Sequence, residues 1–179
     1  MKIAKVIMIS ALALIVAGAA FFGLFFGKKP NAQPTQKSND ELLFDYWHGD
    51  MQWEETRSFS VPEYGGVDFK WSSGAVSANG ETLFCGMPVW SVYLADLNGD
   101  GLREIVSCAS FGSGIVDERI YAYDYSGKQL YVLQSRFNSD FTLFMNNGEV
   151  WARECEYMSS NVISERRLAL SEMKSGGDY

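Results

Sequence analysis

Residues 89–109 read VWSVYLADLNGDGLREIVSCA, two apolar runs joined by a short turn that is rich in oxygen-bearing side chains. The first run is Val89–Ala95 and the second is Leu102–Ala109, and neither has helical spacing. A turn rich in Asp and Gly between two strand-like runs is typical of a β-hairpin. This segment therefore predicts a β fold.

The turn itself has the oxygen spacing of a calcium loop. Calcium prefers six to eight oxygen ligands at about 2.3–2.6 Å, which alternating residues of a tight loop can supply. Gly101 permits the sharp turn, whereas Ser107 stands where an EF-hand has its bidentate Glu, so the loop is not a complete EF-hand. The predicted ligands of a Ca²⁺ ion are Asp96, Asn98, Asp100, the carbonyl of Leu102 and Glu104. The alternative is an ordinary hairpin turn in which the same side chains cap backbone amides without a metal.

Short strand-like segments continue over 65–170, separated by turn residues such as Asn79-Gly80 and Asn146-Asn147-Gly148. Ahead of them, apolar and aromatic residues recur at helical spacing over 41–48, which predicts a short helix. We expect one mainly β domain over 39–179. Its predicted architecture is an antiparallel sheet sandwich or a blade-like domain with a short N-terminal helix, preceded by one transmembrane helix.

The N-terminal segment has no charged residue between Lys5 and Lys28 and is almost wholly apolar there. About twenty apolar residues in a helix span a hydrocarbon core of ~30 Å. We therefore expect a transmembrane anchor over 1–27, followed by a flexible polar linker over 28–38. A cleaved signal peptide is the alternative, because Ala17-Gly18-Ala19 resembles a cleavage site, but the apolar run continues beyond it.

Charge is divided unevenly along the chain. All 22 acidic residues lie from Asp40 onward, together with 10 of the 15 basic ones, so that 38–179 has a formal charge of −12. Such acidity disfavours binding to nucleic acids. Lysines flank the apolar segment on both sides, so the positive-inside rule does not decide its orientation. The signal-like N-terminus and a weak calcium loop favour a single-pass protein of the cell membrane whose C-terminal domain is extracytoplasmic.

Catalytic patterns are not evident. His48 is the only histidine, and the chain has neither a zinc ligand set nor a Gly-x-Ser-x-Gly nucleophile elbow. Nothing in the sequence selects a pair of carboxylates as a glycosidase acid and base. We therefore expect a protein that is not an enzyme.

Cysteines and aromatic residues leave alternatives open. Buried free thiols are the expected state of the three cysteines, and a Cys85–Cys108 bridge is the alternative. Tyr121, Tyr123 and Tyr125 would share one face of a strand. They could form part of a β core, or they could line a groove for a glycan.

Several segments together have the pattern of a known family. The runs LFCGMPVW at 83–90, the loop at 96–104, FGSGIVD at 111–117 and YAYDY at 121–125 form this pattern. They resemble the extracytoplasmic C-terminal domain of some Gram-positive membrane metallopeptidases of the antirepressor, β-lactam-sensor type. The resemblance runs from about residue 65 to 170. The chain lacks a His-Glu-x-x-His motif, so peptidase activity is not implied. The resemblance implies a stand-alone outer domain that senses or binds.

The loop is separately similar to the calcium loops of integrin-type propeller repeats, although it occurs once and no internal repeat is evident. Two functions stay open. The first is a membrane-anchored, noncatalytic extracytoplasmic binding or sensing module with a calcium-stabilised loop. The second is a structural subunit of a cell-envelope complex in which calcium only rigidifies the fold. The expected partners are the membrane, through the N-terminal helix, and a cell-wall glycan or a membrane protein.

Overall fold

The computed structural model describes residues 39–176, apart from 48, 50, 113–114 and 136. Over these residues the chain consists of antiparallel strands and two short 3₁₀ turns, which confirms the predicted mainly β fold. The predicted anchor over 1–27 and linker over 28–38 lie outside the described residues, as does His48. Among the residues described, no helix has the length and apolar character needed to cross a membrane.

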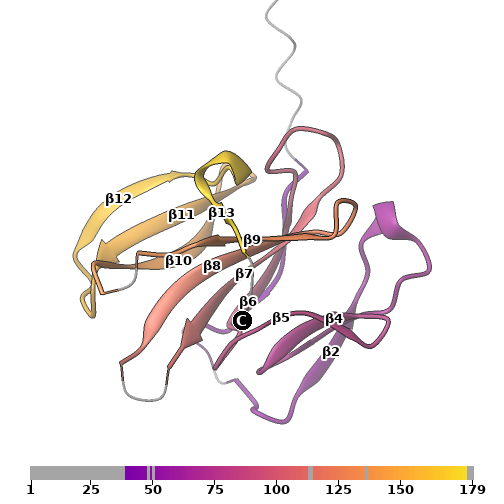
Figure 1. Cartoon of the computed structure of the whole chain (residues 1–179), viewed down its shortest axis with the longest axis horizontal. Helices are drawn as coiled ribbons and strands as arrows, with labels where there is room; N and C mark the ends of the chain where they lie inside the picture. The colour runs from indigo at the N-terminus through magenta and orange to yellow at the C-terminus, as the bar shows by residue number, and fades with distance from the viewer. Residues whose placement is uncertain (1–38, 48, 50, 113–114, 136, 177–179) are drawn as a thin grey trace, which may run out of the picture. The chain divides into compact units, whose positions relative to one another are not determined.

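A six-stranded sheet forms the middle layer of the domain (Figure 1). Four strands follow one another through it as an up-and-down meander: β6 (Ser91–Ala95), β7 (Glu104–Phe111), β8 (Asp117–Asp124) and β9 (Gln129–Leu133). β1 (Glu41–Asp45) lies beside β6 at one edge, and β13 (Lys174–Ser175) lies beside β9 at the other. Segments from both ends of the described chain thus complete one sheet.

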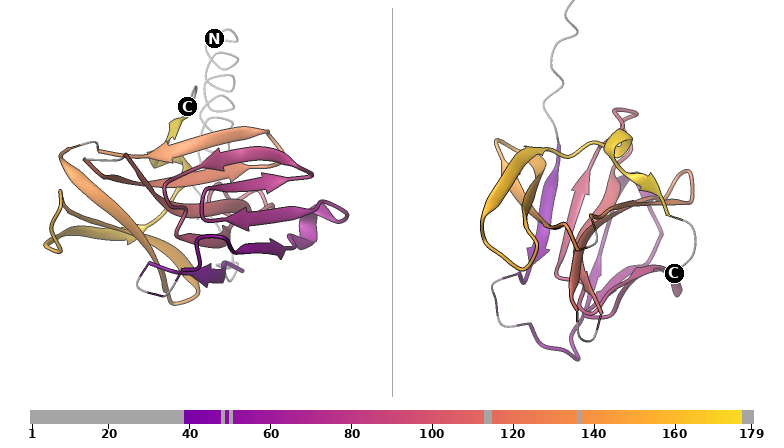
Figure 2. Two further views of the ribbon diagram at one scale, coloured as in Figure 1. Left: turned by 90° about the horizontal axis from the view of Figure 1, so that it is seen from below. Right: turned by 60° about the vertical axis from the view of Figure 1, so that its left-hand side comes forward.

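Two smaller sheets cover the two faces of this layer (Figure 2). The four-stranded sheet consists of β2 (Thr56–Phe59), β3 (Phe69–Ser72), β4 (Ala75–Ala78) and β5 (Glu81–Cys85). The three-stranded sheet consists of β10 (Ser139–Asn146), β11 (Glu149–Glu156) and β12 (Val162–Arg167). The 3₁₀ turns are η1 (Pro62–Tyr64), between β2 and β3, and η2 (Leu170–Glu172), before β13. Three successive antiparallel sheets therefore pack face to face.

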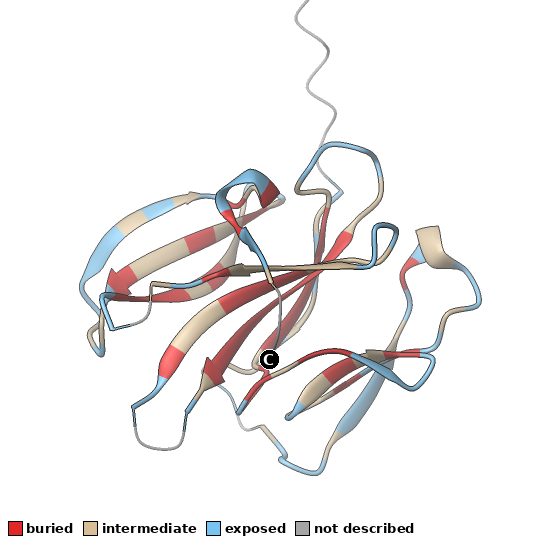
Figure 3. Ribbon diagram, viewed as in Figure 1, coloured by how far each residue is buried: buried red, intermediate tan, exposed pale blue. Residues whose placement is uncertain are grey.

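Strand β7 shows why the middle sheet has a core on each face. Ile105 and Ala109 pack with the four-stranded sheet, whereas Val106 and Cys108 pack with the three-stranded sheet, because successive side chains of a strand point to opposite faces. All residues of β7 except Phe111 are buried, as the red ribbon in the middle layer of Figure 3 shows. A strand covered on both sides is expected to be a near-continuous apolar run.

A buried hydrogen bond joins the four-stranded sheet to the middle layer. Trp71 on β3 is fully buried, and its Nε1–H donates to the carbonyl of Val89 at 3.0 Å, two residues before β6 begins. Leaving such an N–H without an acceptor would cost about 1–3 kcal/mol. Phe44 on β1 and Tyr46 cover the indole, with ring centroids 5.0 and 5.2 Å away. The two layers are therefore held in a fixed register around Trp71.

The Asn-Gly turns are confirmed. Asn79 and Gly80 join β4 to β5 with φ values of 50° and 84°, and Asn147 and Gly148 join β10 to β11 with φ values of 52° and 81°. A two-residue hairpin of this type needs positive φ at both central residues, which Asn and Gly adopt most readily.

The predicted short helix over 41–48 is wrong, because Glu41–Asp45 form β1. This strand pairs antiparallel with β6, with an irregularity after Leu42. β6 is buried along its whole length, so an unpaired edge there would leave backbone amides and carbonyls without partners. The need to pair this edge outweighs a helical spacing that extends over only a few residues.

The three cysteines are free thiols; Cys108 and Cys155 are buried, as expected, whereas Cys85 is only half-buried. Cys108 lies in the core shared with the three-stranded sheet, where its Sγ–H donates to the carbonyl of Phe141 at 3.2 Å. Cys85 lies on β5, in the sheet that covers the opposite face of the middle layer. The alternative Cys85–Cys108 bridge is therefore not formed.

Candidate functional site

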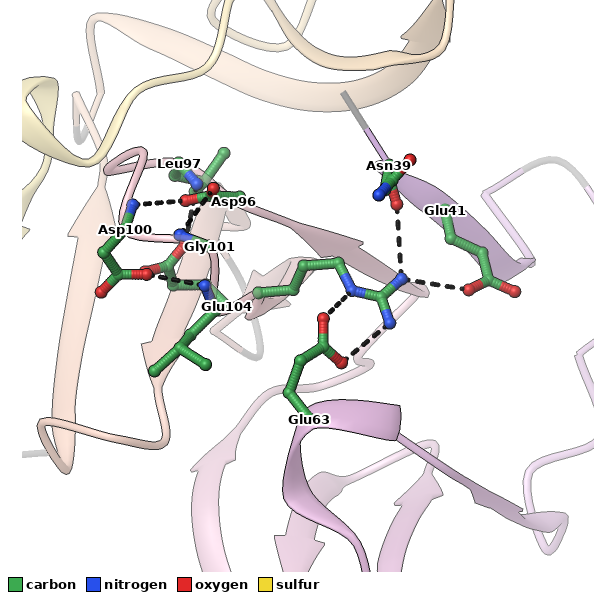
Figure 4. A network of polar contacts seen from close by, with 10 residues as sticks. Asn39, Glu41, Glu63, Asp96, Leu97, Asp100, Gly101 and Glu104 are labelled. Carbon is green, nitrogen blue, oxygen red and sulfur yellow. Dashed lines mark hydrogen bonds and ion pairs between the residues drawn. The ribbon is translucent and has the colours of Figure 1, made fainter. Parts of the chain in front are cut away.

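The predicted calcium loop connects β6 to β7, and its side chains turn onto its own backbone (Figure 4). The Asp96 carboxylate accepts hydrogen bonds from the backbone N–H groups of Gly99 at 2.7 Å, Asp100 at 3.1 Å and Gly101 at 3.0 Å. Asp100 Oδ1 accepts from the N–H of Leu102 at 2.8 Å. Both glycines have positive φ, 80° and 88°, which lets the chain reverse within few residues.

Asn98 lies between two carboxylates of the loop. Its Nδ2 donates to Asp100 Oδ2 at 3.1 Å and to Glu104 Oε1 at 3.0 Å. Its Oδ1 accepts from the backbone N–H of Asp100 at 2.8 Å. The amide thus supplies the partial positive charge that lies between the two acidic side chains. A bound cation would supply that charge in full, and the amide oxygen is then the atom of Asn98 suited to face it.

Glu104 is the buried member of the loop, with 2% of its surface exposed. Its Oε2 accepts from the backbone N–H of Leu97 at 2.8 Å. Burial raises the pKa of Glu104 from 4.5 to about 7, and repulsion from Asp100 and Asp124 adds to the rise, against the lowering effect of backbone hydrogen bonds. The negative charge of an ionised Glu104 is therefore only partly balanced by the groups around it. A hard cation would balance it and so stabilise the ionised form.

All five predicted ligand residues lie in this one loop. Three carboxylates, one amide and one carbonyl form the oxygen donor set that calcium prefers. In the part of the chain that the structure describes, no group of three or more His, Cys, Asp or Glu side chains is placed to hold a metal ion. The hydrogen bonds seen are those of a capped turn, and Asp96 Oδ1 already accepts two of them. The donor types are those that calcium prefers, but the described side chains are arranged as a capped turn, so calcium binding stays a prediction.

Arg103, which the sequence analysis did not select, joins the loop to two other elements through Glu63 and Glu41, both labelled in Figure 4. Its Nε and Nη2 donate to the two carboxylate oxygens of Glu63 on η1, at 2.5 and 2.9 Å. Its Nη1 donates to the carbonyl of Asn39 and to the carboxylate of Glu41 on β1, both at 3.3 Å. The position of the loop is therefore coupled to β1 and to η1.

A second candidate site is a cavity of about 480 Å³ between β5 and the part of the middle sheet formed by β8, β9 and β13. Small-ligand sites in proteins typically measure about 300–1,000 Å³. The lining residues are Thr82, Leu83, Phe111, Arg119, Tyr121, Tyr123, Lys128, Gln129, Leu130, Val132, Gln134, Lys174, Ser175 and Gly176. Aromatic and aliphatic walls and several polar groups thus meet in one cavity.

The tyrosines of β8 contribute to both a core and this cavity. Tyr121 is buried, and its ring stacks on Phe84 with the centroids 5.3 Å apart. Tyr123 and Tyr125 are half-buried against the same core. The core alternative is therefore confirmed for Tyr121. Tyr121 and Tyr123 nevertheless line the cavity, so one wall of it is aromatic.

Charged groups in the cavity lining, as far as the structure describes it, are all basic: Arg119, Lys128 and Lys174. This contrasts with the formal charge of −12 over 38–179. Arg119 on β8 and Lys128 in the β8–β9 turn are close in the sequence, whereas Lys174 on β13 is distant from both. No local motif could have revealed the contribution of Lys174, because the pairing of β13 with β9 brings it to the cavity.

An acidic cluster lies at another cavity, of about 400 Å³, whose lining includes Glu118, Asp140 and Cys155. Asp140 accepts hydrogen bonds from the backbone N–H groups of Met158 at 2.7 Å and Glu118 at 3.5 Å. Burial raises the pKa of Glu118 from 4.5 to about 7, and the charges of Asp140 and Asp117 raise it further. The protonation of Glu118 therefore changes near neutral pH.

Comparisons with known proteins do not identify a relative. No protein-family model matches the chain, and no curated protein or solved structure matches it. The resemblances to the metallopeptidase-linked outer domain and to the integrin-type loop stay predictions. Function must therefore be argued from the loop and the cavities.

Proposed function

We propose that this chain is a noncatalytic, calcium-stabilised binding module, anchored in the cell membrane by its N-terminal segment, with its β domain outside the cytoplasm. The cavity of about 480 Å³ is the observation that supports a binding role most directly. Apolar and aromatic walls with a few polar groups are typical of small-ligand sites. Fragments of cell-wall glycan are the first ligands to test, because the aromatic wall offers ring faces to a sugar.

Calcium has a structural task in this proposal. It would be held by Asp96, Asn98, Asp100, the carbonyl of Leu102 and Glu104. Its charge would offset the repulsion among three carboxylates and so stiffen the β6–β7 hairpin. β7 pairs along its length with β8, the strand that contributes Arg119, Tyr121 and Tyr123 to the cavity. A stiffer hairpin therefore means a better fixed cavity wall.

Filling the cavity tests the proposed function. Thr82 is exposed on β5 and lines the cavity, so Thr82→Trp should occupy it with little effect on the core. Thr56→Trp is the matched control, because Thr56 is exposed on β2, at the other edge of the same sheet. We expect soluble cell-wall fragments to bind the full chain in detergent and the control alike. Ligand-observed NMR should show binding roughly tenfold weaker to Thr82→Trp. Equal affinity in all three proteins would overturn the assignment of the cavity.

Exposed apolar residues on the three-stranded sheet favour a second candidate, the structural subunit. Val162 and Ile163 on β12 are 53% and 54% exposed. β12 is an edge strand, and an apolar edge can add a strand from another protein. Val162→Thr with Ile163→Thr keeps the strand propensity and removes most of the apolar surface. An assembly that dissociates in this double variant during sedimentation would favour the second candidate, whereas monomers in both proteins would disfavour it.

A further inference from the structure

We propose that the cavity beside β5 binds a small anion, a molecule with a carboxylate or phosphate group on a compact carbon skeleton, with Lys128 and Lys174 as its charge partners. The inference rests on the proposed binding function and gives the chemical class of ligand for that same cavity.

The two lysines differ from the other basic residues that the structure describes. An ion pair with Asp or Glu is formed by each of Arg57, Lys70, Arg103, Arg119, Arg153, Arg166 and Arg167. Lys128 and Lys174 form no ion pair with any described residue, and both line the same cavity. An anion that enters the cavity would therefore meet two ammonium groups that no described carboxylate neutralises, in a domain with 22 acidic residues.

The backbone fixes where these lysines start. Lys128 lies in the turn between β8 and β9, with a φ of 52°. Lys174 lies on β13 opposite Val132 of β9, and the N–H of Gly176 donates to the carbonyl of Leu130 at 2.7 Å, which continues the pairing. Both side chains are exposed. The backbone of each lysine is therefore held next to β9, Lys128 at the start of the strand and Lys174 on the neighbouring β13. Each ammonium group can reach a ligand in the cavity from there.

Arg119 adds a buried donor to the same cavity. Its side chain is 16% exposed, pairs with Asp117 through Nη2, and lies over the ring of Phe111 at 4.8 Å. Its Nε is buried and has no hydrogen-bond partner among the described residues. Buried N–H groups are rarely left without acceptors in folded proteins. An oxygen of an anionic ligand would provide the acceptor that is missing here.

The acidic surroundings do not rule out an anion. Screening at physiological ionic strength acts over about 8 Å, so exposed acidic side chains farther than that from a ligand act weakly on it. Glu81 and Asp124 are close enough to help raise the pKa of Tyr123, after burial and Tyr125, but neither lines the cavity. The apolar wall formed by Tyr123, Leu130 and Val132 suits the carbon skeleton of the ligand. Contacts with Lys128 and Lys174 therefore determine the preference of the cavity for an anionic over a neutral ligand.

Matched probes test the inference on the full chain in a neutral detergent. Titration of D-glucuronate against D-glucose tests the carboxylate, and titration of glycerol 3-phosphate against glycerol tests the phosphate. We expect at least one anion to bind roughly tenfold more tightly than its neutral counterpart, as charge-assisted contacts to lysine should give. Lys128→Gln with Lys174→Gln should weaken that anion roughly fivefold, and higher salt should weaken it too. Lys70→Gln is the matched control, because Lys70 is exposed and paired with Asp68 outside the cavity.

The outcomes separate this inference from the proposed function. Equal binding of charged and neutral probes, lost in Thr82→Trp, would overturn the anionic class and leave the binding module standing. Anion binding that is unchanged in the double lysine variant would also overturn the inference. Absence of binding by all four probes would count against the inference and against a binding role for the cavity together. Whichever anion binds more tightly identifies the group as a carboxylate or a phosphate.

Discussion

Arg103 and Glu63 form a bidentate ion pair, with Nε 2.5 Å from Oε1 and Nη2 2.9 Å from Oε2. The two side chains are 11% and 20% exposed. The hydrogen bond from Arg103 holds the pKa of Glu63 below its ordinary value, although burial opposes this shift. Arg103 is the eighth residue of the predicted calcium loop, and Glu63 lies on η1. A shielded charge pair therefore fixes the loop against the connection between β2 and β3.

Removing this pair should destabilise the domain. Arg103→Ala leaves Glu63 without its partner, and we expect the free energy of unfolding to fall by about 2 kcal/mol. Lys70→Ala is the matched control, because Lys70 and Asp68 are 48% and 54% exposed. It should cost no more than about 1 kcal/mol. Urea unfolding followed by tryptophan fluorescence measures both variants, and equal losses in the two would contradict a structural role for Arg103.

The pH dependence of stability should contain a contribution from Glu118. Its pKa in the folded chain is about 7, above the ordinary value of 4.5, because burial and then the charges of Asp140 and Asp117 disfavour the ionised form. The folded state therefore binds the proton more tightly than the unfolded state does. This contribution to stability is complete below pH 4.5 and is lost as the pH rises to about 7.

Glu118→Gln isolates that contribution. The variant keeps the shape of the neutral side chain and cannot ionise, so its stability should fall less than that of the wild type between about pH 5 and pH 8. Glu54→Gln, at an exposed position, should follow the wild type. Denaturant unfolding at both pH values gives the comparison. Parallel pH profiles for all three proteins would show that Glu118 ionises as freely in the folded chain as in the unfolded one.

The β domain should fold without the N-terminal segment. Residues 38–179 form one compact unit, and both described cores lie within it. We therefore expect removal of Lys2–Gly27 to give a soluble monomer, with circular dichroism typical of strands. Size-exclusion chromatography provides the measurement. A truncated chain that is found only as aggregate, while the full chain folds in detergent, would show that the boundary is wrong.

Local patterns were sufficient for the hairpins and the loop. Asn79-Gly80 forms the turn expected of it because the required backbone conformation depends on those two residues themselves. The five predicted ligand residues from Asp96 to Glu104 are close in the chain, but their joint coordination of calcium stays a prediction. The prediction of a helix over 41–45 is wrong because the partner of this segment, β6, is about fifty residues away in the sequence. The spacing of apolar residues within the segment gives no information about an unpaired sheet edge elsewhere in the chain.

Local sequence patterns could not predict the cavity. Lys128 and Lys174 meet only because β13 returns to pair with β9. Tyr121 could be placed on one face of its strand, but whether that face was core or surface depended on the four-stranded sheet, which packs Phe84 against it. β2 of that sheet lies outside the range 65–170 over which strands are predicted. The burial of Tyr121 and the proximity of the two lysines therefore depend on the long-range order of the strands, which local sequence patterns do not reveal.

Substitutions at Asp100 separate coordination from turn formation. Asp100→Ala removes a predicted calcium ligand and keeps Gly101, so it should abolish most of the stabilisation by calcium. Asp100→Asn should lose less, because its amide oxygen can still coordinate. Magnesium should substitute poorly in the wild type, since it demands an octahedral shell at about 2.0–2.1 Å. Calorimetric titration of each protein with each metal gives the affinities, and equal calcium affinity in wild type and Asp100→Ala would exclude Asp100 as a ligand.

The melting temperature of the full chain in calcium and in chelator tests the calcium-stabilised module most directly. A ligand that binds only the folded state at 100 times its Kd adds about 2.7 kcal/mol to the free energy of unfolding. For a domain of this size that corresponds to a rise of roughly 5–10 °C. We expect this rise for the wild type in calcium at 100 times its Kd and little of it for Asp100→Ala. A folded wild-type protein that melts at the same temperature in calcium and in chelator would contradict the account, and the loop would then be a metal-free turn held by its own hydrogen bonds.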